Sequence, residues 1–221
     1  MIDRIYLGFK ETAIDKSLFF FTKRVFDVVV GIVGTIVLIP LMIIVKLISV
    51  LNGDTDSIWF VQKRIGKNGR EFDLIKFRTM VMGADQLLEK LLREDKELAY
   101  EYKVYKKLDN DPRVTKIGGF LRKTSLDECP QFLNILTGSM SFIGNRPYLP
   151  RERKDMGNDY KIIVRTKPGL TGLWQVSGRS NVSFKHRLEI EKKYSENIGF
   201  KQDLEIFIKT FKVVIKSMGA K

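Results

Sequence analysis

The chain has only one cysteine, Cys129, and only one histidine, His186, among its 221 residues. One cysteine excludes an intrachain disulfide, and so few thiol and imidazole groups argue against a zinc site with the usual nitrogen and sulfur ligands. A metal would therefore have to bind oxygen atoms, which favours Mg²⁺ or Mn²⁺. The sequence also lacks internal repeats, low-complexity tracts and composition shifts, so we expect one domain over residues 1–221.

Acidic residues are in short supply relative to basic ones. Lys and Arg number 39 against 26 Asp and Glu, which gives a formal net charge of +13. Such a surplus implies an anionic partner: nucleic acid, acidic lipid or a phosphorylated small molecule. A nucleic-acid surface would combine basic with aromatic residues, whereas this sequence offers a long apolar stretch, so we expect no nucleic-acid partner.

That stretch covers residues 28–45 and contains no charged side chain. As a straight helix it would span about 27 Å, just short of the hydrocarbon thickness of a bilayer. A buried core helix is the alternative, but a core helix usually keeps a polar stripe. The stretch therefore predicts a segment that enters a membrane.

Two features favour a segment that dips into the membrane and returns. Pro40 lacks an amide proton and its ring clashes with the carbonyl group of Ile36, so we expect the helix to bend there. Lys23 and Arg24 precede the stretch and Lys46 follows it, and the positive-inside tendency places both basic ends on the cytoplasmic side. We therefore predict a re-entrant helical hairpin over residues 23–50, with a cytoplasmic region over residues 51–221 that carries the chemistry.

The remaining sequence predicts a helix-rich α/β region. Two apolar runs, 58–65 and 72–77, are joined through Asn68 and Gly69, a strong signal for a β-hairpin. Leucines at helical spacing predict helix between residues 84 and 108, which ends at the loop beginning with Asp109. Five apolar residues recur at helical spacing, while three lysines occupy another face: Leu204, Phe207, Ile208, Phe211 and Ile215, and Lys209, Lys212 and Lys216. This pattern predicts an amphipathic helix, suited either to a lipid surface or to packing on a core.

The densest group of chemically capable side chains lies between Arg122 and Pro130. Ser125 and Glu128 have the spacing of a capping box, and Pro130 is tolerated only near a helix start, so we expect Asp127 and Glu128 at a helix N-terminus. A plain helix cap is one interpretation. The other is chemical, because a helix N-terminus and nearby cations keep a carboxylate ionised. An ionised aspartate can attack phosphorus, and its neighbour can bind Mg²⁺.

Two later segments offer further contacts for phosphate. Residues 138–147 place Arg146 in a glycine-flanked turn, where backbone amides can also donate. Residues 165–179 form a glycine-rich loop with Lys167 near one end and Arg179 at the other. Ordinary turns with solvated cations would give the same patterns, and neither segment matches a Walker P-loop or a dinucleotide fingerprint.

Six short motifs follow one another along nearly the whole chain from Lys23 onward. They are residues 23–27 (KRVFD), 76–80 (KFRTM), 124–128 (TSLDE), 138–147 (GSMSFIGNRP), 167–172 (KPGLTG) and 203–206 (DLEI). In these motifs the sequence resembles the bacterial sugar transferase family, the monotopic phosphoglycosyl transferases. Because six ordered motifs agree, the resemblance is far more specific than any one of them.

The resemblance implies transfer of a sugar-1-phosphate from a UDP-sugar to undecaprenyl phosphate, with release of UMP. Residues 173–175 and the 84–108 insertion look like those of relatives that transfer a hexose phosphate. The reaction starts a surface polysaccharide or other glycoconjugate at the cytoplasmic face of the bacterial inner membrane, where the apolar segment would be the re-entrant helix. The resemblance leaves a homodimer open. A catalytically silent scaffold of the same fold is the alternative, and the intact pair Asp127–Glu128 argues against it.

The resemblance also gives roles to particular residues. Asp127 matches the nucleophile that takes the phosphosugar covalently, and Glu128 matches the partner that binds Mg²⁺. Positions that contact phosphate or nucleotide are matched by Arg122, Arg146 and Arg179. Asp203 falls where the family keeps a carboxylate near the active site. Further substrate-binding candidates are Lys167, which lies in a matching motif, and Glu191, which stands where aspartate is usual. Asn145 replaces the proline that usually precedes the arginine at 146.

Overall fold

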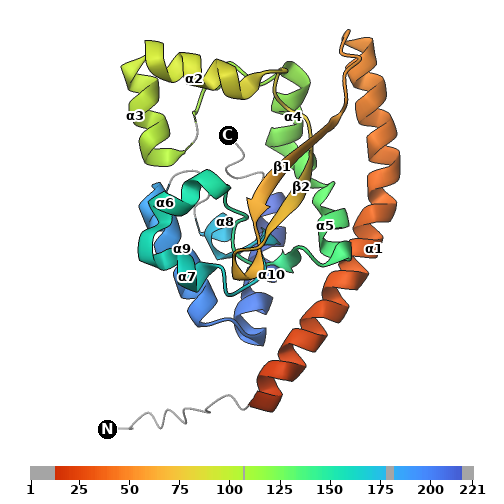
Figure 1. The fold of residues 1–221 in the computed structure, drawn as a ribbon. Helices are drawn as coiled ribbons and strands as arrows, with labels where there is room; N and C mark the ends of the chain where they lie inside the picture. The colour runs from red at the N-terminus through yellow and green to blue at the C-terminus, as the bar shows by residue number, and fades with distance from the viewer. Residues whose placement is uncertain (1–12, 107, 178–181, 216–221) are drawn as a thin grey trace.

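The computed structural model of this protein describes residues 13–106, 108–177 and 182–215 (Figure 1). The first half of the chain forms α1 (Ala13–Leu51), β1 (Trp59–Ile65), the turn η1 (Lys67–Gly69), β2 (Glu71–Phe77), α2 (Ala84–Glu94), α3 (Lys96–Tyr105) and α4 (Lys116–Thr124). The second half forms η2 (Leu126–Glu128), α5 (Gln131–Thr137), β3 (Ser141–Ile143), η3 (Pro150–Glu152), α6 (Arg153–Met156), η4 (Gly157–Asp159), α7 (Tyr160–Ile163), β4 (Gly169–Thr171), α8 (Leu173–Val176), α9 (Phe184–Glu196) and α10 (Phe200–Ile215). These elements confirm the helix-rich α/β class.

The longest element is α1, which runs along one side of the molecule (Figure 1). It continues through Pro40, so the helical hairpin expected over residues 23–50 is replaced by a single uninterrupted helix. A proline removes one backbone hydrogen bond and can bend a helix without ending it. Packing on both sides of Pro40, through Leu38 and Val45, outweighs that loss. Within the described residues, α1 is the one helix long and apolar enough to cross a membrane.

One face of α1 packs against the rest of the protein along almost its full length. The buried positions on this face include Phe19, Asp27, Leu38, Val45 and Ser49. Gly34 lets α1 approach α5 closely, because a Cβ atom there would lie 2.2 Å from the ring of Phe132. The opposite face leaves large apolar side chains exposed, including Val29, Val33, Ile36, Ile43 and Leu47. The helix therefore has a protein-facing side and an apolar side that no other described part of the chain covers.

The charged residues near the start of the apolar stretch point into the protein rather than outward. Arg24 donates to the carbonyl oxygens of Ile135 and Leu136 at the end of α5, at 2.8 Å each. A helix C-terminus favours a cation there. Lys23 donates to a carbonyl oxygen of β3, and Asp27 accepts from the backbone and a side chain of the same strand. These charges, which the sequence assigned to the membrane boundary, join α1 to the fold.

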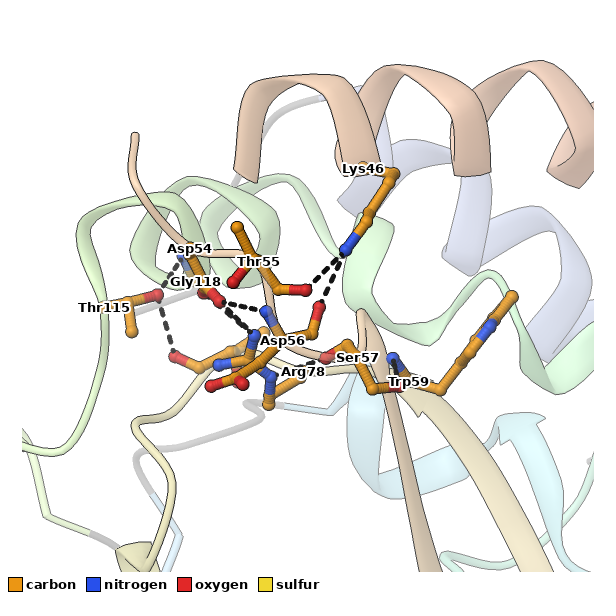
Figure 2. Close-up of polar contacts among 10 residues, drawn as sticks. Lys46, Asp54, Thr55, Asp56, Ser57, Trp59, Arg78, Thr115 and Gly118 are labelled. Atoms are coloured by element: carbon orange, nitrogen blue, oxygen red, sulfur yellow. Dashed lines mark hydrogen bonds and ion pairs between the residues drawn. The ribbon is translucent and has the colours of Figure 1, made fainter. Parts of the chain in front are cut away.

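A polar network fastens the far end of α1 to the β-hairpin (Figure 2). Lys46 donates to the carbonyl oxygens of Thr55 and Asp56, at 2.9 and 3.0 Å. Arg78, just after β2, donates to both carboxylate oxygens of Asp54, at 2.7 and 2.9 Å. The hydrogen bond from Arg78 lowers the pKa of Asp54. The segment between α1 and β1 is therefore held from both sides.

Strands β1 and β2 pair as the predicted antiparallel hairpin, with Phe60 opposite Lys76 and Arg64 opposite Phe72. The turn between them uses positive φ angles at Asn68 (58°) and Gly69 (78°), as the Asn-Gly pair predicted. Leu74 of β2 packs on α5, and Phe77 packs on α1 and α4.

The helix predicted between residues 84 and 108 forms as two helices, α2 and α3. Asp95 ends α2 and caps α3, because its Oδ1 accepts hydrogen bonds from the amides of Glu97 and Leu98 at 2.8 and 3.0 Å. The two helices lie on the opposite side of the view from α1 (Figure 1). Leu88 is the buried residue of this pair of helices.

The C-terminal half is organised around β3 and β4, which pair in parallel. Tyr194 of α9 and Ile206 of α10 pack on Ile143 of β3, so these two helices cover the pair. The helix predicted here forms as α10, and Leu204, Ile208 and Phe211 of its predicted apolar face are about half exposed, whereas its buried apolar residue, Ile206, lies outside that face. The predicted Lys216 lies outside the described residues.

Candidate active site

Asp127 and Glu128 lie in η2, a single 3₁₀ turn between α4 and α5. The capping box expected from Ser125 is not formed. Ser125 takes a left-handed conformation (φ 59°) that ends α4, and its side chain caps neither α4 nor η2. The serine–glutamate spacing is also compatible with a helix end followed by a tight turn, which is the form that occurs here. Pro130 does precede α5, so both carboxylates sit just before a helix start.

Lys76 on β2 reaches across to Glu128, and its Nζ atom lies 2.7 Å from Oε1 of the carboxylate. The Lys76 and Glu128 side chains are 23% and 37% exposed, so the pair faces solvent. The sequence showed Lys76 only as part of a motif, because its pairing with η2 depends on how the hairpin packs. The fold therefore adds one cation to the predicted site.

Asp127 is the buried member of the carboxylate pair, at 9% exposure. Burial raises the pKa of its carboxyl group to about 6, against the lowering effect of Lys76, while Glu128 adds to the rise and Arg122 opposes it. The nearby cations therefore do not keep this pKa low, as the sequence led us to expect. At neutral pH the group is still ionised, and a poorly hydrated carboxylate is a better nucleophile than a solvated one.

Arg122, in the last turn of α4, donates from Nε to Oγ1 of Thr79 at 2.9 Å. Burial lowers the pKa of Arg122, and the charge of Asp127 opposes this fall. The two residues therefore act on each other electrostatically. Of the predicted residues, the structure brings together Asp127, Glu128 and Arg122, and it adds Lys76 and Thr79.

Arg146 lies in the turn after β3, next to two elements that are distant in sequence. Its backbone N–H donates to both carboxylate oxygens of Glu191 at 3.0 Å each. Its guanidinium carbon lies 5.6 Å from the centroid of the Trp174 ring, and that of Arg187 lies 4.5 Å from the same ring. Arg187 carries no signal in the sequence, because no local pattern predicts that α9 places it beside Trp174.

Glu191 is 1% exposed, and burial raises the pKa of its carboxyl group to about 8. It holds the turn at Arg146 through the backbone. Asn145 supports the same turn: its Nδ2 donates to the carbonyl oxygen of Ile163 and to Oγ1 of Thr166, at 3.1 Å each. These hydrogen bonds fix the turn without the proline that family members usually carry at 145.

Asp203 pairs with α1 rather than with η2. Its carboxylate lies 2.5 Å from Nζ of Lys23 and accepts a hydrogen bond from the hydroxyl group of Tyr194 at 2.9 Å. The described contacts of this predicted site residue therefore serve the junction of α1, α9 and α10.

Lys167 lies in a separate cavity, which it lines together with Lys67 and Arg70. Burial and then the charge of Arg24 lower the pKa of Lys167. The structure therefore places Lys167 near α1 and the hairpin turn. Arg179, the remaining predicted residue, lies outside the described residues.

The oxygen donors of η2 suit a hard cation. Among the described residues there is no group of three or more His, Cys, Asp or Glu side chains that could hold a metal ion by themselves. Mg²⁺, however, is often bound through one or two carboxylates, waters and the phosphates of a substrate. Asp127 and Glu128 therefore fit an ion that arrives with a diphosphate, and Glu128 is the more exposed candidate ligand.

Comparison with known proteins gives a consistent answer. The profile of a family described as "Bacterial sugar transferase" matches residues 18–217. Similar proteins include the UDP-galactose-lipid carrier transferase of Erwinia amylovora and the undecaprenyl-phosphate galactose phosphotransferase of Salmonella typhimurium, each 41% identical over 200 residues. Another is the exopolysaccharide production protein ExoY of Rhizobium meliloti, 39% identical over 211 residues.

These relatives differ in length. The first two alignments take in 90% of this chain but 42% of each relative, so the chain spans less than half the length of those proteins. The alignment with ExoY takes in 96% of this chain and 93% of ExoY. The family match covers almost all of the described residues. The chain belongs to the bacterial sugar transferase family.

Proposed function

We propose that this protein transfers a sugar-1-phosphate, from a UDP-hexose, to undecaprenyl phosphate and releases UMP. The observation that carries this proposal is the buried carboxylate of Asp127, which stands beside Glu128 within the field of Lys76 and Arg122. A negatively charged oxygen beside two cations is suited to attack a phosphorus atom whose own oxygens are negative. The names of the relatives, which specify galactose and a lipid carrier, support the choice of substrates.

The proposed reaction has two steps at one phosphorus atom. An Oδ atom of Asp127 attacks the β-phosphorus of the UDP-sugar, a bond forms between them, and the bond to the bridging oxygen breaks. UMP leaves with that electron pair. A phosphate oxygen of the lipid then attacks the same phosphorus, which frees the Asp127 carboxylate and yields the lipid diphosphate sugar. Lys76 and Arg122 offset the negative charge that gathers around this phosphorus. Mg²⁺ bound at Glu128 would neutralise part of the diphosphate charge.

For the membrane, we propose that the exposed apolar face of α1 enters the lipid while its other face stays on the catalytic region. A helix packed along one face from Phe19 to Ser49 keeps both ends with the catalytic region. The exposed side chains of α10, Leu204, Ile208 and Phe211, add a second apolar surface. This arrangement describes a monotopic protein, which we place at the cytoplasmic face of the bacterial inner membrane. A homodimer stays a prediction.

UMP release tests the proposed reaction. Purified protein in lipid nanodiscs should release UMP from UDP-galactose or UDP-glucose when undecaprenyl phosphate and Mg²⁺ are supplied. The Asp127→Asn variant should lose at least about 10³-fold in rate, because it lacks the nucleophile. Asp73→Asn is the matched control, since Asp73 forms an exposed ion pair with Lys63. A silent scaffold would release no UMP in the wild-type form with any UDP-sugar.

A further inference from the structure

Two arginines from distant parts of the chain lie over one aromatic ring, and a third arginine is close enough to act on one of them electrostatically. Arg146 and Arg187 both lie over the ring of Trp174, and Arg64 comes from β1. After burial, the charge of Arg146 is the main cause that lowers the pKa of Arg64 and of Arg187, each to about 10. The guanidinium group of Arg146 is therefore repelled by that of Arg64 and by that of Arg187.

Arg64 donates hydrogen bonds to the carbonyl oxygen of Pro147 and to Oε1 of Gln62, which are neutral acceptors. Among the described residues, no ion pair joins any of the three to a carboxylate, and the guanidinium groups of Arg146 and Arg187 make no hydrogen bond. Arg187 is nevertheless only 4% exposed. The Nε atom of each arginine is buried without a partner, as are the hydroxyl group of Tyr148 and the indole N–H of Trp174.

The carboxylates nearest to the cluster accept hydrogen bonds from backbone amides and not from the guanidinium groups. Glu152 accepts the amide of Leu149, and Glu191 accepts the amide of Arg146. Both act on the arginines only at a distance, as charges that favour the protonated form. Unpaired buried cations and orphaned donors are costly for a folded protein and are retained mainly where a function needs them. What the cluster lacks is an anion with several acceptor oxygens.

One member of the cluster, Arg64, also lies on the side of the hairpin that carries the proposed reaction centre. Directly opposite residues of a hairpin point to the same face, and so do alternate residues of a strand, so Arg64 shares a face with Lys76, the partner of Glu128. Glu128 is one of the charges that act on Arg64. An anion at the arginine cluster would therefore lie within electrostatic range of the carboxylate pair.

We propose that Arg146 and Arg187, which lie over Trp174, together with Arg64 bind the phosphate of the nucleoside monophosphate that leaves in the first step. This inference rests on the proposed function and assigns the leaving-group side of its site. When the bond to the bridging oxygen breaks, the monophosphate gains a negative charge. Guanidinium groups match phosphate oxygens with paired N–H donors, so a preformed cluster stabilises this charge as it develops.

The test measures binding of UMP without catalysis. Trp59→Phe leaves Trp174 as the single tryptophan, because the chain has two, so its fluorescence reports on the cluster alone. Trp59 stacks on Phe77 in the core and takes no part in the site. We expect UMP to change the fluorescence of Trp174 and uridine to bind at least tenfold more weakly. Absence of any UMP binding to this variant overturns the inference.

Substitution of Arg187 supplies the second readout. In the Trp59→Phe background, Arg187→Met and Arg64→Met should weaken UMP binding by about 10- to 100-fold, as expected when a charged hydrogen-bond partner is lost. Without nucleotide, Arg187→Met should melt at the same temperature or higher, because an unpaired buried charge has been removed. The matched control is Arg153→Met, which removes an exposed arginine stacked on Tyr160 and should leave UMP binding unchanged.

Two outcomes separate the inference from the proposed function. If Arg187→Met melts lower and binds UMP as tightly as its parent, the cluster is structural and the inference fails, even when UMP is released from a UDP-sugar. If UMP binds as expected while no UDP-sugar is turned over, the proposed function fails and the inference stands. Should Arg187→Met not fold, Arg187→Lys keeps the charge but not the paired donors, and an unchanged UMP affinity in that variant would also overturn the inference.

Discussion

The two charged regions of the site differ in whether their buried charges have partners of opposite sign. Around η2, the carboxylate of Asp127 is buried beside cations that are already in place, with Lys76 paired to Glu128 at 2.7 Å. Around Trp174, the guanidinium groups of Arg146 and Arg187 are buried or stacked without any anionic partner in the described residues. In the first region, charges of both signs are present in the free protein, whereas in the second we propose that a ligand supplies the anion. This difference suggests a reaction centre on one side and a binding site for the departing group on the other.

The largest expected effect is a loss of turnover on substitution in the region around η2. Lys76→Met removes the cation that pairs with Glu128 and that lowers the pKa of Asp127. We expect UMP release to fall about 100-fold at neutral pH, which corresponds to about 2.7 kcal/mol of transition-state stabilisation. Steady-state kinetics in nanodiscs would measure this. Lys63→Met, on the other face of the same hairpin, is the control, and an equal loss in both variants would remove Lys76 from the site.

A carboxylate outside both regions should affect stability instead of turnover. Asp203→Asn leaves Lys23 without an anion, and the two side chains are only 11% and 12% exposed. We expect a loss of about 2 kcal/mol in the free energy of unfolding, with the turnover number per folded molecule unchanged. Thermal melting together with UMP release would show both. A variant that keeps its melting temperature but loses turnover would instead place Asp203 in the active site, as the family resemblance implies.

A further expected effect is a change in how stability depends on pH. Burial raises the pKa of Glu191 to about 8, whereas an unfolded chain releases this proton near pH 4.5. The folded protein holds the extra proton between these values, so stability should fall as pH rises from about 4.5 to 8, by at most about 1.4 kcal/mol per unit. Glu191→Gln should flatten this dependence in thermal melts, while Glu189→Gln, exposed on the same helix, should keep it. Parallel pH profiles for wild type and Glu191→Gln would contradict this account of the pKa.

Local chemistry predicted those features that depend on few residues. Asn68 and Gly69 predicted the hairpin turn, because both residue types adopt positive φ angles at low cost. Pro130 marked the start of α5, and the adjacent residues Asp127 and Glu128 identified the carboxylate pair. Each of these signals acts within a few residues, so no knowledge of the packing was needed.

The errors arose where tertiary contacts decide between local alternatives. Ser125 has the spacing of a capping box, yet it ends α4 in a left-handed conformation. Pro40 suggested a hairpin, but packing on both sides of it keeps α1 continuous. Lys23 and Arg24 looked like a membrane boundary, and their partners on β3 and α5 lie more than a hundred residues away. The stacking of Arg187 on Trp174 likewise depends on a tertiary contact that no local pattern predicts.

The central claim is a covalent bond between Asp127 and a sugar phosphate, and intact-protein mass spectrometry tests it most directly. Wild-type protein would be mixed with UDP-galactose or UDP-glucose and Mg²⁺, without lipid phosphate, and quenched in acid. The account predicts a mass increase equal to one hexose phosphate, located by peptide mapping to Asp127 and lost on addition of undecaprenyl phosphate. An unmodified Asp127 in protein that nevertheless turns over the same UDP-sugar when lipid phosphate is present would contradict it.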